Sequence, residues 1–185
     1  MKAADANILL VPGMSGAGPV HWMTRWEKGM KSARRVVMPN LDAPVLPQWV
    51  DALIGAVSKA DKPVVLVAHS LGVLAAAHAA SEFPPGKVVG GFLVAPPSKR
   101  WVESECEIDN GFAGFPMDPL PFTSMLVASR TDETCDFATS EELALKWLSE
   151  LVDAGDSGHL NTQSGHGPWP EGALRFARFM ARLEP

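Results

Sequence analysis

Ser70 lies at the centre of the pentapeptide Ala68-His69-Ser70-Leu71-Gly72, and in these surroundings its hydroxyl could act as a nucleophile. Residues 63–68 before it (PVVLVA) are apolar throughout, which predicts a central parallel strand covered on both faces. The alanine-rich residues 71–83 after it predict a helix. A serine in a sharp strand-to-helix turn exposes its hydroxyl near the N–H groups of the helix start. The alternative is a helix N-cap, and Ala68 departs modestly from the glycine usual two positions before such a serine.

Such a serine needs a histidine to accept its proton, and the chain has five. His159 follows the last candidate strand, after Asp156-Ser157-Gly158, so the sequence favours it as the base. His166, flanked by glycines seven residues further on, is the alternative. His69 would point away from the serine hydroxyl, and His78 lies two turns into the following helix. His21 begins the first helix and could line a pocket.

The base in turn needs an acid that orients it, and Asp132 follows the apolar residues 124–128 at another strand end. Asp136, four residues further on, is the alternative and is better interpreted as a solvated turn residue. The chain order of Ser70, Asp132 and His159 is the order found in α/β-hydrolases. These three residues form the predicted catalytic set.

A glycine-rich loop, residues 13–18, follows the first candidate strand. Its spacing, G-x-x-G-x-G, differs from the dinucleotide-binding pattern, and no G-K-[ST] follows, so a nucleotide-binding protein is a weak alternative. In a hydrolase such a loop supplies a backbone N–H to the oxyanion hole, and Met14 is the expected donor. The second donor is the residue after the nucleophile, Leu71. The other interpretation is a flexible turn.

Apolar runs alternate with helical patterns along the chain and predict the elements that position these residues. Strands are expected at 7–11, 35–38, 63–68, 88–94 and 124–128, and helices within 21–33, 49–60, 71–83, 140–148 and 171–183. Residues 150–154 either extend a helix or form a last strand, and Thr139 or Ser140 would cap the helix before them. The alternation predicts an α/β fold, with a mostly parallel sheet of about six strands and helices on both faces. Ligands of such sheets bind at the carboxyl ends of the strands, where each motif above falls.

Composition narrows the class of protein. The 185 residues suit a single domain, 1–185, and 46% hydrophobic residues allow a substantial core. A net charge of −5 argues against nucleic-acid binding. Two cysteines fit a reducing, cytoplasmic setting, and neither a signal peptide nor an apolar run of about 20 residues predicts a membrane segment. No metal-binding motif is found, and we expect no metal and no cofactor.

Several motifs together resemble a known family. The first are Val11-Pro12-Gly13, His21-Trp22, Trp26-Glu27, the pentapeptide at 68–72 and Ser129-Arg130-Thr131-Asp132; the last are Gly158-His159-Leu160-Asn161 and the block 167–172 (GPWPEG). In these motifs the chain resembles the small serine hydrolases related to retinoblastoma-binding protein 9 and the bacterial YdeN-type proteins. The resemblance implies a minimal α/β-hydrolase without a large cap domain, and a strand at 150–154. The L-x-C-x-E motif linked to retinoblastoma binding is absent around Cys106, so no such partner is expected.

The sequence therefore predicts a cytoplasmic serine hydrolase that cleaves small esters or related acyl compounds through an acyl-enzyme. Ser70 would be the nucleophile, His159 its base and Asp132 the partner of the base. The resemblance implies the same three roles. The expected partner is a small-molecule acyl substrate, with no nucleic acid and no membrane.

The alternative from another class is a catalytically silent binding protein with the hydrolase fold, because a fold does not determine a function. The complete set of three residues argues against it. The proline-rich residues 95–122 are expected to form a long loop with one helical turn, and to make the pocket wall. Aromatic and apolar side chains there indicate an apolar acyl or alcohol group: Trp101, Phe112, Phe115 and Met117.

Overall fold

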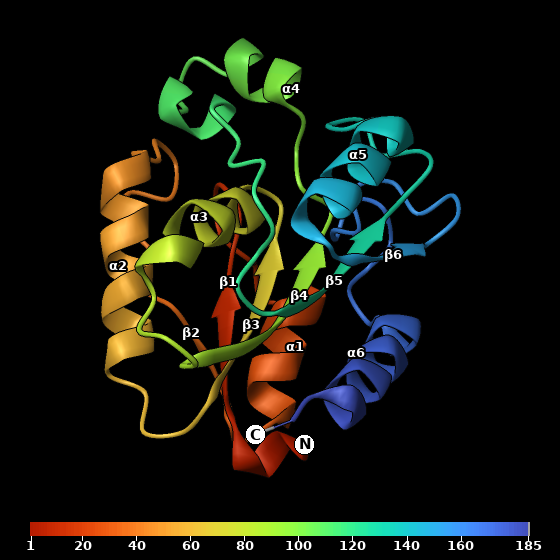
Figure 1. Ribbon diagram of the computed structural model, residues 1–185. Coiled ribbons are helices and arrows are strands. Elements are labelled where there is room, and N and C mark those ends of the chain that lie inside the picture. Colours follow the sequence, from red (N-terminus) through yellow and green to blue (C-terminus); the bar gives the residue numbers. More distant parts are fainter. Residues whose placement is uncertain (185) are drawn as a thin grey trace.

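The computed structural model describes residues 1–184, which form one six-stranded sheet with helices on both faces (Figure 1). All strand pairs are parallel, in the order β2-β1-β3-β4-β5-β6. The strands are β1 (Asn7–Val11), β2 (Ala33–Arg35), β3 (Val64–His69), β4 (Val88–Val94), β5 (Thr123–Ala128) and β6 (Glu150–Asp153). The predicted α/β class and six-stranded parallel sheet are confirmed. Successive crossovers run toward opposite edges on either side of β1 and β3, so the carboxyl ends of these two strands form a switch point that favours ligand binding.

Each face of the sheet is covered by its own layer of helices. On one side lie α1 (Trp22–Gly29) and α6 (Pro170–Arg182); on the other lie α2 (Leu46–Ser58), α3 (Leu71–Ala79) and α5 (Phe137–Trp147) (Figure 1). Successive strand side chains point to opposite faces, so Ile8 packs with the α1 and α6 layer while Leu9 packs with the other. Two hydrophobic cores result, separated by the sheet.

Local sequence explains the two segments that frame the site. All six residues of β3 are buried, which confirms its prediction as a central strand. The alanine side chains of α3 are small and let the helix pack closely against its neighbours, and eight of its nine residues are buried. At the start of α6, Pro170 occupies the first turn and the ring of Trp169 lies where a side chain at position 172 would project. The W-P-E-G block thus packs a tryptophan onto the helix, and only glycine leaves room for the ring at 172.

Some predicted element boundaries are wrong. The second strand was expected at 35–38, but β2 begins at Ala33 because a turn that closes from Ala33 N–H to Met30 O brings the chain alongside β1 earlier. The helix expected from 140 begins at Phe137, and its N-cap is Asp136, whose side chain accepts from the N–H of Thr139 at 2.7 Å. The cap is therefore neither Thr139 nor Ser140. β6 is a strand, as the resemblance implied.

Residues 95–122 hold more structure than the one helical turn expected. They contain α4 (Lys99–Ser104) and a 3₁₀ helix at Asn110–Ala113, which lie beyond the carboxyl ends of the strands (Figure 1). No large cap domain is present among residues 1–184, as predicted. Phe112 is fully buried and packs edge-on against Trp49, with ring centroids 5.7 Å apart. Its predicted place in a pocket wall is therefore wrong, because it belongs to the core between this segment and α2.

Gly72 offers a sharp test of how closely α3 approaches β1. An added Cβ at Gly72 would lie 2.5 Å from the carbonyl oxygen of Pro12 and 2.6 Å from that of Val11, and both are backbone atoms that cannot rotate away. Gly72→Ala is expected to lower the free energy of unfolding by about 1–3 kcal/mol through overpacking. Gly55→Ala in α2, where the Cβ would meet nothing within 4 Å, should instead raise it by up to about 1 kcal/mol. Urea denaturation of both variants distinguishes these results, and equal stabilities would refute the close approach.

Candidate active site

The sheet brings the three residues of the predicted catalytic set together from three different strand ends. Ser70 lies between β3 and α3, Asp132 lies four residues after β5, and His159 lies in the loop after β6. Ser70 Oγ is 2.9 Å from His159 Nε2. His159 Nδ1 is 2.9 Å from Asp132 Oδ2 and 3.0 Å from Oδ1. The side chains of His159 and Asp132 are only 9% and 3% exposed, so this chain of hydrogen bonds is largely shielded from water.

Ser70 has the backbone conformation of a sharp strand-to-helix turn. Its φ of 54° lies in the left-handed region, which is costly for a residue with a side chain and marks a position held by its surroundings. The Ser70 N–H donates to Val94 O at 2.9 Å, which ties the turn to the end of β4. An added Cβ at Gly13 would lie 2.8 Å from Ser70 Cβ, so the loop after β1 must approach without a side chain. The Ser70 side chain makes no capping hydrogen bond and is directed to His159 instead.

The alternatives from the sequence lie elsewhere. His166 Nδ1 is 3.2 Å from Ser164 Oγ, and the ring packs edge-on against Trp169. Asp136 is the N-cap of α5 rather than a solvated turn residue without a role. His21 is buried, and its Nδ1 accepts a hydrogen bond from the N–H of Met23 at the start of α1.

The loop that carries His159 is held by two side chains from distant parts of the chain. His69 Nε2 lies 2.9 Å from the carbonyl oxygen of His159, and Trp22 Nε1 donates to the carbonyl oxygen of Leu160 at 2.9 Å. Leu160 has a φ of 50°, so the loop bends sharply just after the histidine. Sequence reasoning missed both supporting roles. The His21-Trp22 motif was noted only as part of a resemblance, and nothing local indicated which carbonyl it would bind.

Two further histidines lie beside His159 and are held in the neutral form. Burial, then the nearby Arg35, lowers the pKa of His21 to about 4. Burial lowers the pKa of His69 well below its usual value, and the neighbouring His159 contributes. The ring centroid of His69 lies 5.2 Å from that of His21 and 5.0 Å from that of His159. Both groups therefore add hydrogen-bonding rings, but no positive charge, to the neighbourhood of Ser70 at neutral pH.

These lowered pKa values predict acid sensitivity of the fold. Both histidines take up a proton near pH 6.5 in the unfolded chain but only at lower pH in the folded one, so the unfolded state binds more protons as the pH falls below about 6.5. The free energy of unfolding should therefore fall below that pH, by up to about 1.4 kcal/mol per pH unit for each histidine. Urea denaturation at pH 7, 6 and 5 measures this. His21→Asn keeps an acceptor for the helix start but cannot titrate, and should flatten the dependence; an unchanged slope would contradict the assignment.

The predicted oxyanion donors lie next to the serine. Leu71 is the first residue of α3, so its N–H has no acceptor within the helix. Met14 follows Gly13, which is in close approach to Ser70. Within residues 1–184 neither N–H donates to a protein acceptor. In the loop of Met14, the neighbouring N–H groups do: that of Ser15 donates to Leu41 O, and that of Gly16 donates to Gly13 O.

The buried thiol near the site is unsuited to nucleophilic chemistry. Cys135 is 3% exposed, and burial raises its pKa to about 11. A protonated thiol is a poor nucleophile at neutral pH. Within the described residues, 1–184, no group of three or more histidine, cysteine, aspartate or glutamate side chains could hold a metal ion. In the same range, no helix is long and apolar enough to cross a membrane.

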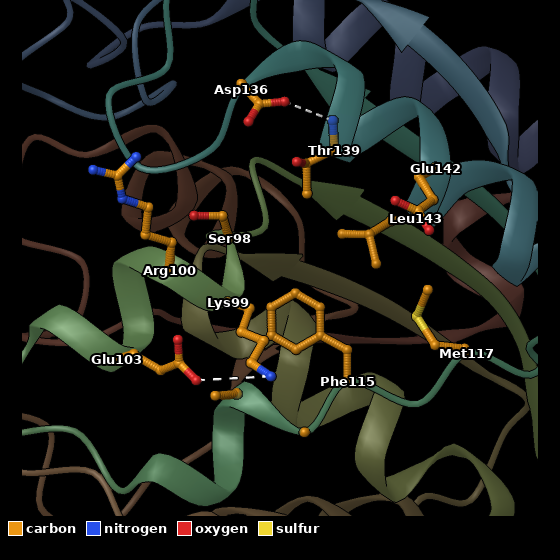
Figure 2. A pocket seen from close by; sticks show the side chains of 12 residues that line it. Ser98, Lys99, Arg100, Glu103, Phe115, Met117, Asp136, Thr139, Glu142 and Leu143 are labelled. Carbon is orange, nitrogen blue, oxygen red and sulfur yellow. Dashed lines mark hydrogen bonds and ion pairs between the residues drawn. The ribbon is translucent and has the colours of Figure 1, made fainter.

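A surface cavity of about 620 Å³ lies between α4, the residues after it and α5 (Figure 2). Phe115, Met117 and Leu143 supply its apolar wall, whereas the Lys99–Glu103 ion pair lies at its α4 side. Phe115 and Met117 thus line a cavity, but Ser70, Asp132 and His159 do not line it, so the place of Phe115 and Met117 in the wall of the active-site pocket stays a prediction. Trp101 lines a neighbouring cavity of about 400 Å³, together with Thr134 from the loop that carries Asp132.

The all-parallel sheet, with Ser70 in the strained turn after a central strand, defines an α/β-hydrolase fold. A family model described as serine hydrolase matches residues 8–178, so the chain belongs to the serine hydrolase family and is a hydrolase. The expected family resemblance is confirmed.

Solved structures agree with this family. A protein described as a YdeN-like hydrolase from Pectobacterium atrosepticum is 32% identical, with a TM-score of 0.86 over 99% of this chain and 95% of that chain. The ydeN gene product of B. subtilis is 21% identical, with a TM-score of 0.80 over 95% and 98%. Est1E from Butyrivibrio proteoclasticus, solved with ferulic acid bound, is 12% identical, with a TM-score of 0.71 over 95% and 89%. The last two show a shared fold alone. No curated protein matches this chain in sequence.

Proposed function

We propose that this protein is a carboxylesterase-like serine hydrolase that cleaves small esters or related acyl compounds, with Ser70, His159 and Asp132 as its catalytic triad. The observation that carries the proposal is the continuous path of hydrogen bonds from Ser70 Oγ through both ring nitrogens of His159 to Asp132. This arrangement lets the imidazole accept the serine proton while the carboxylate stabilises the resulting positive charge.

The reaction follows from these positions. Ser70 Oγ attacks the carbonyl carbon of the ester as its proton moves to His159 Nε2, and the carbonyl electron pair moves onto the oxygen. The N–H groups of Met14 and Leu71 stabilise that oxyanion. The intermediate collapses, and the leaving alcohol takes the proton from Nε2. A water molecule, deprotonated by His159, then releases the acid and restores Ser70.

The segment over the strand ends supports a small substrate with an apolar part. Among the helices of residues 1–184, α4 and a 3₁₀ helix lie beyond the strand ends in place of a large cap domain, so access is limited by one short segment. The aromatic and apolar side chains of that segment favour an apolar acyl or alcohol group. Phe115 and Met117 line the cavity of Figure 2, whereas the proposed triad does not line it.

Labelling with a fluorophosphonate tests the proposal directly, because such probes react with an activated serine. We expect one equivalent of label on the peptide that contains Ser70, located by mass spectrometry, with turnover of p-nitrophenyl acetate lost in parallel. Label on another residue would overturn the assigned nucleophile. A folded protein that neither takes the label nor turns over activated esters of any chain length would favour the binding-protein alternative.

A further inference from the structure

Thr134 lies between the two partners of the predicted acid–base pair. Its N–H donates to Asp132 Oδ1 at 2.8 Å, and its hydroxyl oxygen is 2.9 Å from the same oxygen. The hydroxyl oxygen also lies 3.1 Å from His159 Nδ1. The residue is 6% exposed, so water does not replace these contacts.

The direction of the hydroxyl hydrogen bond follows from the chemistry of its neighbours. An ionised carboxylate can only accept, so the single hydroxyl proton of Thr134 goes to Asp132 Oδ1. Oδ1 then accepts from both the N–H and the hydroxyl of Thr134 and lies 3.0 Å from His159 Nδ1, while Oδ2 lies 2.9 Å from the same nitrogen. Two donors from Thr134 on one oxygen fix the rotation of the carboxylate about its own bond. Both carboxylate oxygens are therefore held facing the imidazole.

The opposite end of Thr134 is fixed to the segment that bounds the cavity. The Thr134 carbonyl oxygen accepts from the N–H of Ser98 at 3.0 Å and from its hydroxyl at 2.8 Å. Ser98 is the N-cap of α4, because its Oγ accepts from the N–H of Trp101 at 3.2 Å. Ser98 also lines the cavity seen in Figure 2. The loop of Asp132 is thus joined through one residue to the wall of the cavity.

We propose that Thr134 is a positioning residue that holds Asp132 in the orientation His159 requires, and that links this orientation to the placement of α4. The inference rests on the proposed function, since it assigns a role within the same triad. Its hydroxyl does not contact the substrate. It acts on Asp132, and through Asp132 on the alignment of His159 with Ser70.

Two substitutions distinguish the effect of the Thr134 hydroxyl on turnover from the effect of the shape of the side chain. Thr134→Val is nearly isosteric and lacks the hydroxyl, whereas Thr134→Ser keeps the hydroxyl and loses a methyl group. We expect Thr134→Val to lower kcat for p-nitrophenyl acetate by about 10- to 100-fold, as for one hydrogen bond to a charged group, with KM changed by less than about twofold. The kcat of Thr134→Ser should stay within about threefold of wild type. The same order should hold for the rate of fluorophosphonate labelling.

Controls keep the outcomes distinct. Thr123→Val places the same change at the exposed, amino end of β5 and should leave kcat unchanged. If the Val variant is unfolded at the assay temperature, Thr134→Ala is measured in its place. The role of Thr134 alone is overturned in two cases, both with turnover that still depends on Ser70. In the first, kcat is unaffected by Thr134→Val; in the second, kcat falls as much in Thr134→Ser as in Thr134→Val. Wild-type turnover that does not depend on Ser70 overturns the proposed function as well.

Discussion

Ser70→Ala is expected to reduce ester turnover by about 10⁵-fold or more, with KM changed little, as for removal of the nucleophile from other serine hydrolases. The physical reason is that the substitution removes the proposed nucleophile, Ser70 Oγ, which lies 2.9 Å from His159 Nε2. The proposed oxyanion donors are backbone groups that the substitution leaves in place, so a small residual rate above that of water should persist. Steady-state kinetics with p-nitrophenyl acetate measures the loss.

A matched control comes from another buried serine. Ser124 is 4% exposed and shares a hydrogen bond of 2.6 Å with Ser149, near the amino end of β5. Ser124→Ala should leave kcat within about threefold of wild type, because its hydroxyl lies at the opposite end of the strand from Asp132. Thermal melting shows whether either variant has lost structure. Turnover in Ser70→Ala within tenfold of wild type, from a pure sample, would remove Ser70 from the mechanism.

His159→Ala is expected to cost about 10⁴- to 10⁶-fold in kcat, whereas His166→Ala should change it by less than about threefold. Both histidines follow β6, but only His159 places one ring nitrogen on Ser70 and the other on Asp132. His166 is hydrogen-bonded to Ser164 and packs against Trp169, so its contacts support the local structure of the loop. Adding imidazole to His159→Ala should restore part of the turnover, because the vacated space can admit a soluble base. The assignment is wrong if only the His166 variant loses activity.

Much of the fold follows from local patterns in the sequence. The amphipathic α6 has the periodicity of a helix. The wholly apolar β3 and the buried, alanine-rich α3 have no such periodicity and follow instead from residue type, since β3 is rich in valine and α3 in alanine. The site serine follows from the same patterns, since the strand-to-helix turn at Ser70 is encoded by its neighbours. Element boundaries were less predictable. β2 begins at Ala33 because of its pairing with β1 across the sheet, which no local pattern records.

The cap at Asp136 is a local feature that the sequence interpretation missed, whereas the burial of Phe112 depends on tertiary context. Aspartate is as good a cap as threonine or serine, but only Thr139 and Ser140 were expected as caps, and the helix begins earlier, where the Asp136 side chain accepts from the N–H of Thr139. An aromatic residue in a loop could face solvent, a cavity or the core. The contact with Trp49, 63 residues earlier in the chain, placed Phe112 in the core.

The sequence by itself determined the class of fold, the strand ends that carry Ser70 and Asp132, and the order of the three residues along the chain, whereas its patterns left the strand before His159 open. Those properties depend on neighbours within a few residues, through apolar periodicity and the steric needs of a tight turn. The tertiary structure alone decided the distances between the three side chains, and the supports that Trp22, His69 and Thr134 supply to their loops. Trp22 reaches a carbonyl 138 residues away and His69 one 90 residues away, and such pairings arise only when the parallel strands set their carboxyl ends side by side.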